Sequence, residues 1–157
     1  MSDSLILTKA KAFAIRVVKL HKYLRGKREA TMSKQILRCG TSIGANLAEA
    51  KYAQSKDDFI SKQSIALKEA GETLYWLELL RDVDLIPDND AYKTIYADCE
   101  ELIRLLVASL KKLKPLEIKD GVQLYDRIAQ AEAEIDAGKG LDARESLHRT
   151  SEGFSSR

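Results

Sequence analysis

Apolar residues recur at alternating steps of three and four along four long segments of the chain. This spacing places apolar side chains on one face of an α-helix, which completes a turn about every 3.6 residues. In the first segment, the predicted buried stripe consists of Ile6, Ala10, Phe13, Val17, Leu20 and Leu24. Gly26 follows the stripe, and glycine is common where a helix ends. The pattern therefore predicts a first helix that ends near residue 26.

Two further helices are predicted in the middle of the chain. The second covers about residues 31–53 and is rich in small residues. The third begins at about Lys56, because Ser55 and Asp58 have the spacing of a capping box, in which side chains bond to the free backbone groups of a helix start. Its apolar stripe is predicted to contain Phe59, Ala66, Ala70, Leu74, Leu77 and Leu80.

A fourth helix is predicted over about residues 90–113, and Pro115 ends the pattern. Its stripe contains Tyr92, Ile95, Cys99, Leu102, Leu106, Leu110 and Leu113. Helices of this length are roughly 35 Å long. Because the connections are short, consecutive helices should pack antiparallel. The sequence therefore predicts an all-α protein whose main unit, residues 1–118, is an up-down-up-down four-helix bundle.

Residues 119–157 differ from the bundle in charge and pattern. Residues 122–137 have the spacing of a shorter amphipathic helix. From Asp120 onward there are five Lys or Arg and eight Asp or Glu, a net charge of −3, whereas residues 1–119 carry a net charge of +5. We expect residues 119–157 to form a short, acidic, helical C-terminal extension.

The second predicted helix combines helical periodicity with glycines, which cost about 1 kcal/mol each in a helix interior. Gly40, Gly44 and Ala48 recur every four residues and form a stripe where another backbone can approach closely. Polar residues lie beside this stripe, and they could form either a ligand site or hydrogen bonds between subunits. We interpret the region as an oligomer interface formed by Arg38, Gly40, Ser42, Gly44, Asn46 and Glu49.

Residue types limit the possible chemistry. No segment approaches the roughly 20 apolar residues needed to span a bilayer, and the N-terminus lacks the pattern of a secretory signal, so we expect a cytoplasmic protein without membrane contact. Cys39 and Cys99 lack a metal-binding spacing and are expected to be small core residues. Glu145 and His148 form a single Glu-x-x-His pair, whereas a two-metal bundle uses two. We expect no metal, no cofactor and no enzymatic activity.

Positive charge is concentrated near the N-terminus. Residues 1–38 contain ten Lys or Arg and only two acidic residues, a net charge of +8, although the whole chain carries +2. The candidate nucleic-acid-binding residues are Lys11, Arg16, Lys22, Arg25, Lys27, Arg28 and Lys34. Tyr23 is the one exposed candidate for stacking on bases. The same charges could instead form a solvated helix surface.

A distinctive set of residues runs through the second and third predicted helices: Arg38 to Glu49, Ser55, Asp58, Phe59, Ile65, Ala66 and Glu69 to Leu80. These residues resemble a bacterial four-helix-bundle family, first noted as proteins encoded within intervening sequences of large-subunit ribosomal RNA. The resemblance covers about residues 5–114. The family also includes the accessory variability determinant of diversity-generating retroelements, a basic bundle that partners a reverse transcriptase.

The resemblance implies an antiparallel bundle that assembles as a ring-shaped homopentamer, with nucleic acid as ligand and a reverse transcriptase as a candidate protein partner. Two functions from different classes remain open. The first is a non-enzymatic, oligomeric nucleic-acid-binding accessory factor that acts through the basic surface of the first two helices. The alternative is a protein–protein interaction scaffold that binds no nucleic acid.

Overall fold

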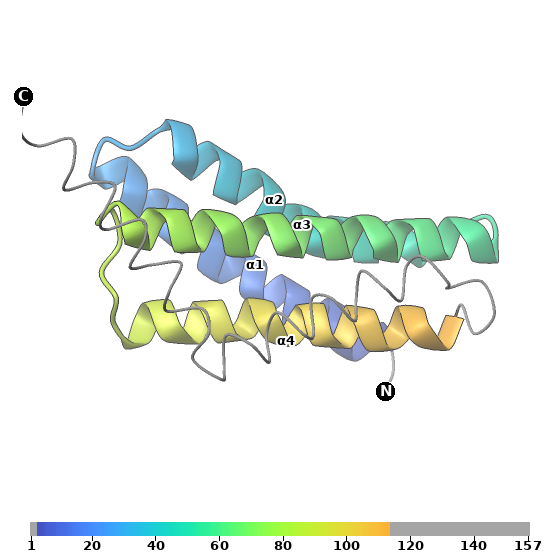
Figure 1. The fold of residues 1–157 in the computed structure, drawn as a ribbon. Coiled ribbons are helices and arrows are strands. Elements are labelled where there is room, and N and C mark those ends of the chain that lie inside the picture. The colour runs from blue at the N-terminus through green and yellow to red at the C-terminus, as the bar shows by residue number, and fades with distance from the viewer. Residues whose placement is uncertain (1–2, 114–157) are drawn as a thin grey trace, which may run out of the picture. The chain divides into compact units, whose positions relative to one another are not determined.

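The structure, a computed structural model, describes residues 3–113. This part of the chain forms four helices in the order α1 (Asp3–Gly26), α2 (Thr31–Ala50), α3 (Lys56–Asp82) and α4 (Asp90–Leu113). Figure 1 shows that each helix runs back along the one before it. No strand is present in the described residues. The prediction of an all-α antiparallel bundle is confirmed, whereas the predicted boundary at residue 118 and the acidic extension lie outside the described residues.

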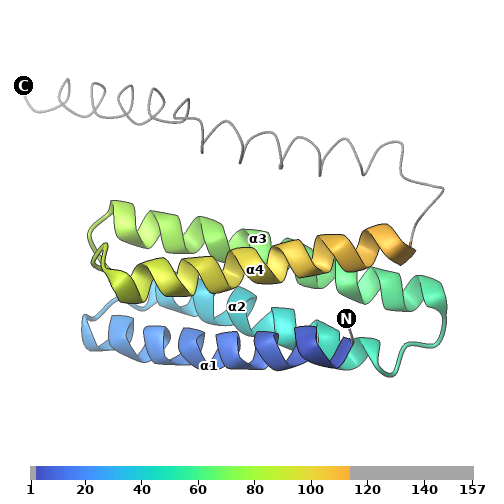
Figure 2. The ribbon, with the colours of Figure 1, turned by 90° about the horizontal axis from the view of Figure 1, so that it is seen from below.

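Most residues of the predicted apolar stripes form the interior of the bundle, but Phe59 and Leu113 are only half-buried, and Ile60 is buried in place of Phe59. Helix α2 packs between α1 and α3, α3 packs against α4, and α4 returns to α1, although α1 and α4 touch less extensively than the other neighbouring pairs. Figure 2 shows α1 and α4 side by side, with the end of α1 and the start of α4 at the same end of the bundle. Buried stripe residues include Phe13, Val17 and Leu24 of α1 and Cys99, Leu102 and Leu106 of α4.

The start of α3 follows the capping pattern seen in the sequence. Ser55 has an extended backbone, and its Oγ accepts a hydrogen bond of 3.1 Å from the backbone N–H of Asp58. The Asp58 carboxylate accepts a bond of 3.1 Å from the backbone N–H of Gln54, one residue before the cap. These bonds satisfy backbone donors that have no partner inside the helix, which fixes its first residue.

Helix α2 ends at Ala50, three residues earlier than the predicted end at 53. The backbone N–H groups of Lys51, Tyr52 and Ala53 each donate to the carbonyl oxygen three residues earlier, at 2.9 to 3.3 Å. Bonds of this type tighten the last turn and end a helix.

Gly40 explains how closely α1 approaches α2. A Cβ atom added to Gly40 would lie 2.8 Å from both Cγ atoms of Val17, whereas one added to Gly44 would meet Ala10 at an ordinary 3.7 Å. The close approach that the glycine spacing predicted is therefore present, and it occurs between two helices of the same chain. The glycines consequently provide no separate argument for a neighbouring subunit.

Both cysteines are buried, as expected of core residues. Burial raises the pKa of the Cys39 thiol and of the Cys99 thiol, because a charged thiolate is poorly solvated in the interior. Both side chains are therefore protonated and unreactive at neutral pH.

Candidate nucleic-acid interface

The exposed face of α1 carries three of the predicted phosphate-binding cations. Lys11, Lys22 and Arg25 are exposed, and none of them forms an ion pair with any other residue in 3–113. Lys11 and Lys22 lie on the side of the helix away from the buried stripe, and Arg25, which directly follows the buried Leu24, lies at the edge of that side. Their charges are therefore available to an external anion.

Apolar side chains interrupt this basic face. Ile15 is 51% exposed and Val18 is 36% exposed. Ile15 lies four residues after Lys11 and four residues before Lys19, so the three are neighbours on the helix surface. The exposed face of α1 therefore combines cations with aliphatic groups, a feature that the charge count alone did not reveal.

Arg16 belongs to a different environment from the other predicted cations. Its guanidinium forms an ion pair of 2.6 Å with Asp98 and donates bonds of 2.8 Å to Thr94 Oγ1 and 3.2 Å to the carbonyl oxygen of Ala91. These bonds join α1 to α4. Arg16 is half-buried and its charge is already compensated, so its main role in this structure is to link two helices.

The turn after α1 adds further positive charge. Arg28 adopts a left-handed backbone with φ of 62°, and its side chain is exposed, as is that of Lys34 at the start of α2. Lys27 donates a bond of 3.1 Å to the carbonyl oxygen of Leu85, and its ammonium also lies 4.7 Å from the ring centre of Tyr23. Together with the exposed face of α1, this turn forms what we call the basic surface: Lys11, Lys22, Arg25, Lys27, Arg28 and Lys34.

An apolar hollow of about 530 Å³ lies next to the basic surface, between α1 and the start of α4. Arg16, Lys19, Leu20 and Tyr23 contribute its α1 wall. The opposite wall comes from the α3–α4 connection and from α4: Ile86, Pro87, Asn89, Ala91, Tyr92 and Ile95. The hollow lies between α1 and α4, the neighbouring helices that touch least extensively in the described bundle.

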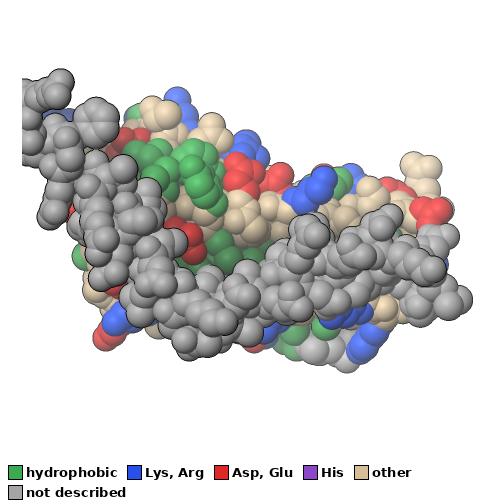
Figure 3. Space-filling view, in the orientation of Figure 1, with side chains coloured by type: hydrophobic (Ala, Val, Ile, Leu, Met, Phe, Trp, Pro, Cys, Tyr) green, Lys and Arg blue, Asp and Glu red, His purple; other side chains and the backbone are tan. Residues whose placement is uncertain are grey.

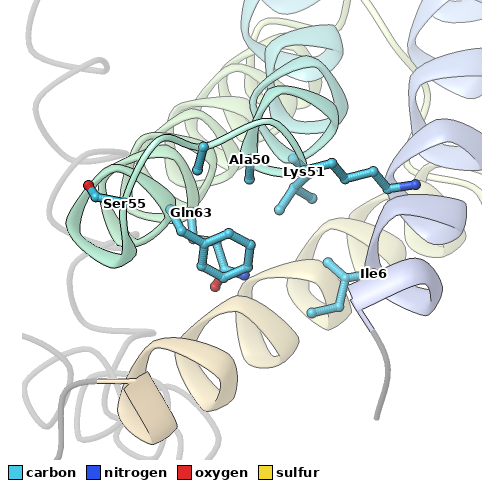
Figure 4. Close-up of a pocket in the computed structure, with 8 residues that line it drawn as sticks. Ile6, Ala50, Lys51, Ser55 and Gln63 are labelled. Carbon is cyan, nitrogen blue, oxygen red and sulfur yellow. The ribbon is translucent and has the colours of Figure 1, made fainter.

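A second hollow, of about 410 Å³, lies at the other end of the bundle around the α2–α3 connection. Figure 4 shows Ile6, Ala50 and Gln63 around it, with the Lys51 side chain pointing away from Gln63 and Ser55. Gln63 is buried, and its carbonyl oxygen accepts a bond of 2.8 Å from Ser109. None of the predicted nucleic-acid-binding residues lines this hollow, so it is separate from the basic surface.

The polar residues predicted to lie at an oligomer interface contact α3 of the same chain or their own helix. Arg38 forms ion pairs with Glu69, at 3.3 Å, and with Glu72. Glu49 pairs with Lys62 at 2.7 Å. Ser42 and Asn46 donate to carbonyl oxygens one turn earlier in α2. These contacts account for the polar stripe within one chain, and the assignment of these residues to a subunit interface stays a prediction.

The face seen in Figure 3 differs from the basic surface, because it carries acidic and basic side chains together with a group of apolar ones near the C-terminal end of α3. Exposed apolar residues in this part of α3 and just after it include Tyr75, at 58%, and Val83, at 48%. Trp76 packs partly into the core and donates a bond of 3.2 Å to Glu72.

The described residues hold no group of three or more His, Cys, Asp or Glu that could bind a metal ion. The single Glu-x-x-His pair, Glu145 and His148, lies outside them. His21 bonds to the Ser33 hydroxyl at 2.7 Å and thereby joins α1 to α2. Among residues 3–113, none of the helices is long and apolar enough to cross a membrane.

Comparison with known proteins identifies the family. The family model of the 23S rRNA-intervening sequence protein matches residues 2–108. This chain belongs to that family. A crystal structure from Bacteroides thetaiotaomicron VPI-5482, described as a protein with unknown function from the S23 ribosomal protein family, is similar, with 50% sequence identity and a TM-score of 0.68. The match covers 71% of this chain and 99% of that one. None of the curated proteins matches the chain.

The family assignment confirms the resemblance drawn from the residues between Arg38 and Leu80. The four described helices agree with the bundle fold that this resemblance implies. Neither the family description nor the similar crystal structure assigns an activity, so the function has to be argued from the surface of this chain.

Proposed function

We propose that this member of the family is a non-enzymatic nucleic-acid-binding accessory factor that acts through the basic surface. The observation that carries the proposal is the set of exposed cations on α1, Lys11, Lys22 and Arg25, which have no ion-pair partner in the described residues. Other cations in the bundle, such as Arg16 and Arg38, are paired with carboxylates.

Unpaired cations on one face favour a polyanion for a physical reason. Binding of Lys or Arg to phosphates releases condensed counterions from the nucleic acid, and this release drives association without reading the sequence. A cation already paired with a carboxylate contributes less, because that pair would first have to be broken. The family name refers to 23S rRNA, so we choose RNA as the first probe.

The test reverses three charges of the basic surface, in the variant Lys11→Glu, Lys22→Glu, Arg25→Glu. All three side chains are exposed, so we expect the helical circular dichroism and the melting temperature to stay near those of the wild type. Each lost phosphate contact removes about 0.7 to 0.9 from the slope of log affinity against log salt. The triple variant should therefore bind RNA at least about tenfold more weakly, with a slope shallower by about two. Fluorescence anisotropy over a salt series measures both.

The matched control reverses three other exposed cations, in the variant Lys56→Glu, Lys68→Glu, Arg104→Glu. These residues lie on α3 and α4 and also form no ion pair within 3–113. The net charge changes by the same amount, so a general electrostatic effect would weaken both variants equally. If the two triple variants bind RNA with equal affinity, the basic surface is not the binding site.

The second candidate function is a protein–protein interaction scaffold, and Ile15 and Val18 favour it. A surface that binds only phosphates has no need for exposed aliphatic side chains between its cations. An acidic protein partner with apolar groups would match such a face, and a reverse transcriptase is one candidate from the family resemblance. If wild-type protein shows no salt-dependent binding to RNA or DNA, the scaffold function takes first place.

A further inference from the structure

The hollow between α1 and α4 has the size and composition of a binding site. Its volume of about 530 Å³ lies within the range of about 300 to 1,000 Å³ that is common for sites binding small organic groups. Apolar groups from Leu20, Ile86, Pro87 and Ile95 line it. Such a cavity accepts a flat, largely apolar group better than it accepts a phosphate.

Tyr23 stands where this hollow meets the basic surface. Its side chain is 44% exposed and lines the hollow. The Lys27 ammonium lies 4.7 Å from the ring centre, so a base would stack on the part of the ring that Lys27 leaves open. Lys19 lies one helical turn before Tyr23 and also lines the hollow, and Lys22 lies three residues after Lys19 on the exposed face. Lys19 and Lys22 thus lie beside the aromatic wall on the α1 side. On the opposite side, the Arg81 guanidinium lies 5.2 Å from the ring centre of Tyr92 and is paired with Asp82 at 2.9 Å.

We propose that this hollow binds an unpaired base of a single-stranded nucleic acid, with Tyr23 stacking on the base and with Lys19 and Lys22 meeting the adjacent phosphates. The proposal rests on the proposed function and adds to it the preferred form of the ligand. A base in a duplex is stacked and paired and cannot enter the hollow without being flipped out, whereas a base in a single strand is free to enter.

Charges around the hollow set the direction from which the strand approaches. Arg16 is held by Asp98, so Lys19 is the cation in the wall that has no ion pair within the described residues. Asp88 and Asp90 are exposed on either side of Asn89, at the opposite wall. These carboxylates repel phosphates, and the charge of Arg81 on that side is compensated by Asp82, so the backbone of the strand lies along α1 and the base points toward α4.

The test compares Tyr23→Ala with Tyr52→Ala in the full chain. Tyr52 is 86% exposed in the α2–α3 connection, far from the hollow in the fold, so its substitution controls for loss of an exposed tyrosine. The probes are labelled oligouridylate, oligothymidylate, a random-sequence DNA duplex and an abasic strand of equal length. Stacking of one base on an aromatic side chain changes affinity by about fivefold to a hundredfold.

We expect Tyr23→Ala to weaken binding of the single strands by about tenfold and to leave duplex binding and the salt slope unchanged, because no phosphate contact is lost. Tyr23→Trp, which keeps an aromatic ring, should restore binding. Wild-type protein should bind the abasic strand as weakly as Tyr23→Ala binds oligothymidylate. The two single strands show whether RNA and DNA are distinguished.

The proposal is overturned if Tyr23→Ala and Tyr52→Ala bind single strands equally, or if the wild type binds the abasic strand as tightly as oligothymidylate. In either case, retained salt-dependent binding by the wild type leaves the basic surface intact as the nucleic-acid interface. If the wild type binds none of the probes, the proposed function itself fails. Failure of the base-binding proposal can therefore be distinguished from failure of the proposed function.

Discussion

At the scale of single residues, Gly40 and Gly44, which lie one helical turn apart on α2, pack differently against α1. A Cβ at Gly40 would lie 2.8 Å from the Val17 side chain, while a Cβ at Gly44 would lie 3.7 Å from Ala10. The first distance is too short for carbon atoms, and the second is an ordinary contact. The difference arises in α1, where one partner is the branched Val17 and the other is the small Ala10.

We therefore expect opposite effects from the same substitution. Gly40→Ala should lower the free energy of unfolding by about 1–3 kcal/mol, because the added methyl overpacks the contact with Val17. Gly44→Ala should be neutral or should raise it by up to about 1 kcal/mol, because alanine is the better helix former. Urea denaturation followed by circular dichroism gives both values.

Val17→Ala in the Gly40→Ala background makes room for the new methyl. The double variant should therefore lose less free energy of unfolding than the two single variants lose together. If Gly40→Ala and Gly44→Ala were equally stable, α1 and α2 would be able to move apart without a cost in free energy.

The residue scale also shows what the sequence could not reveal. Arg16 and Lys22 have the same charge and lie on the same helix, so the sequence groups them together. Only the fold brings Asp98, 82 positions later, into contact with Arg16 and leaves Lys22 without such a partner in the described residues. Whether a cation is available to a ligand depends on contacts between distant segments, which a helical projection of one segment does not contain.

At the scale of elements, helix boundaries were largely predictable, because their causes are local. The predicted start of α3 at Lys56 and the predicted limits of α4 agree with the structure. Apolar periodicity and capping residues act within one turn of the chain, so the sequence alone carries them. Partners of the α2 polar residues were not predictable, since Arg38 meets Glu69 and Glu72 only after α2 and α3 pack together.

The cap of α3 provides a test at this scale. Ser55→Ala removes the hydroxyl that accepts from Asp58, so the helix should lose about 1 kcal/mol of stability. Ser61→Ala removes an exposed hydroxyl inside the same helix and should change stability by no more than about 0.5 kcal/mol. Thermal melts of the two variants check the difference, and a similar loss in both would mean that the Ser55 cap contributes no specific stabilisation.

At the scale of the whole molecule, the fold class followed from the sequence, but the hollow beside Tyr23 did not. It lies between α1 and α4, the first and last helices of the described bundle, which touch less extensively than the other neighbouring pairs. That packing reflects the combined geometry of all four helices rather than any local pattern. Tyr23 was nevertheless identifiable from the sequence as the one exposed aromatic residue among the cations of the first helix.

Assembly is the remaining prediction at this scale. The family resemblance implies a homopentamer, and the exposed side of α2 beside Ser42 and Glu49 carries the small residues Ala45 and Ala48, which permit close approach of another helix. We expect light scattering coupled to size-exclusion chromatography to report several times the chain mass of 17.6 kDa. Ala45→Arg should reduce this mass, because an exposed arginine in place of a methyl blocks close packing between subunits.

Ala97→Arg is the matched control, since Ala97 is exposed on α4 and receives the same added charge and volume away from the α2 surface. Neither substitution reaches the core, so both variants should keep the helical circular dichroism of the wild type. Loss of the oligomer in Ala45→Arg alone would place the interface on α2. A wild-type monomer at micromolar concentration would contradict the assembly prediction, and the intrachain contacts of Arg38 and Glu49 would then be a complete account of the polar residues on α2.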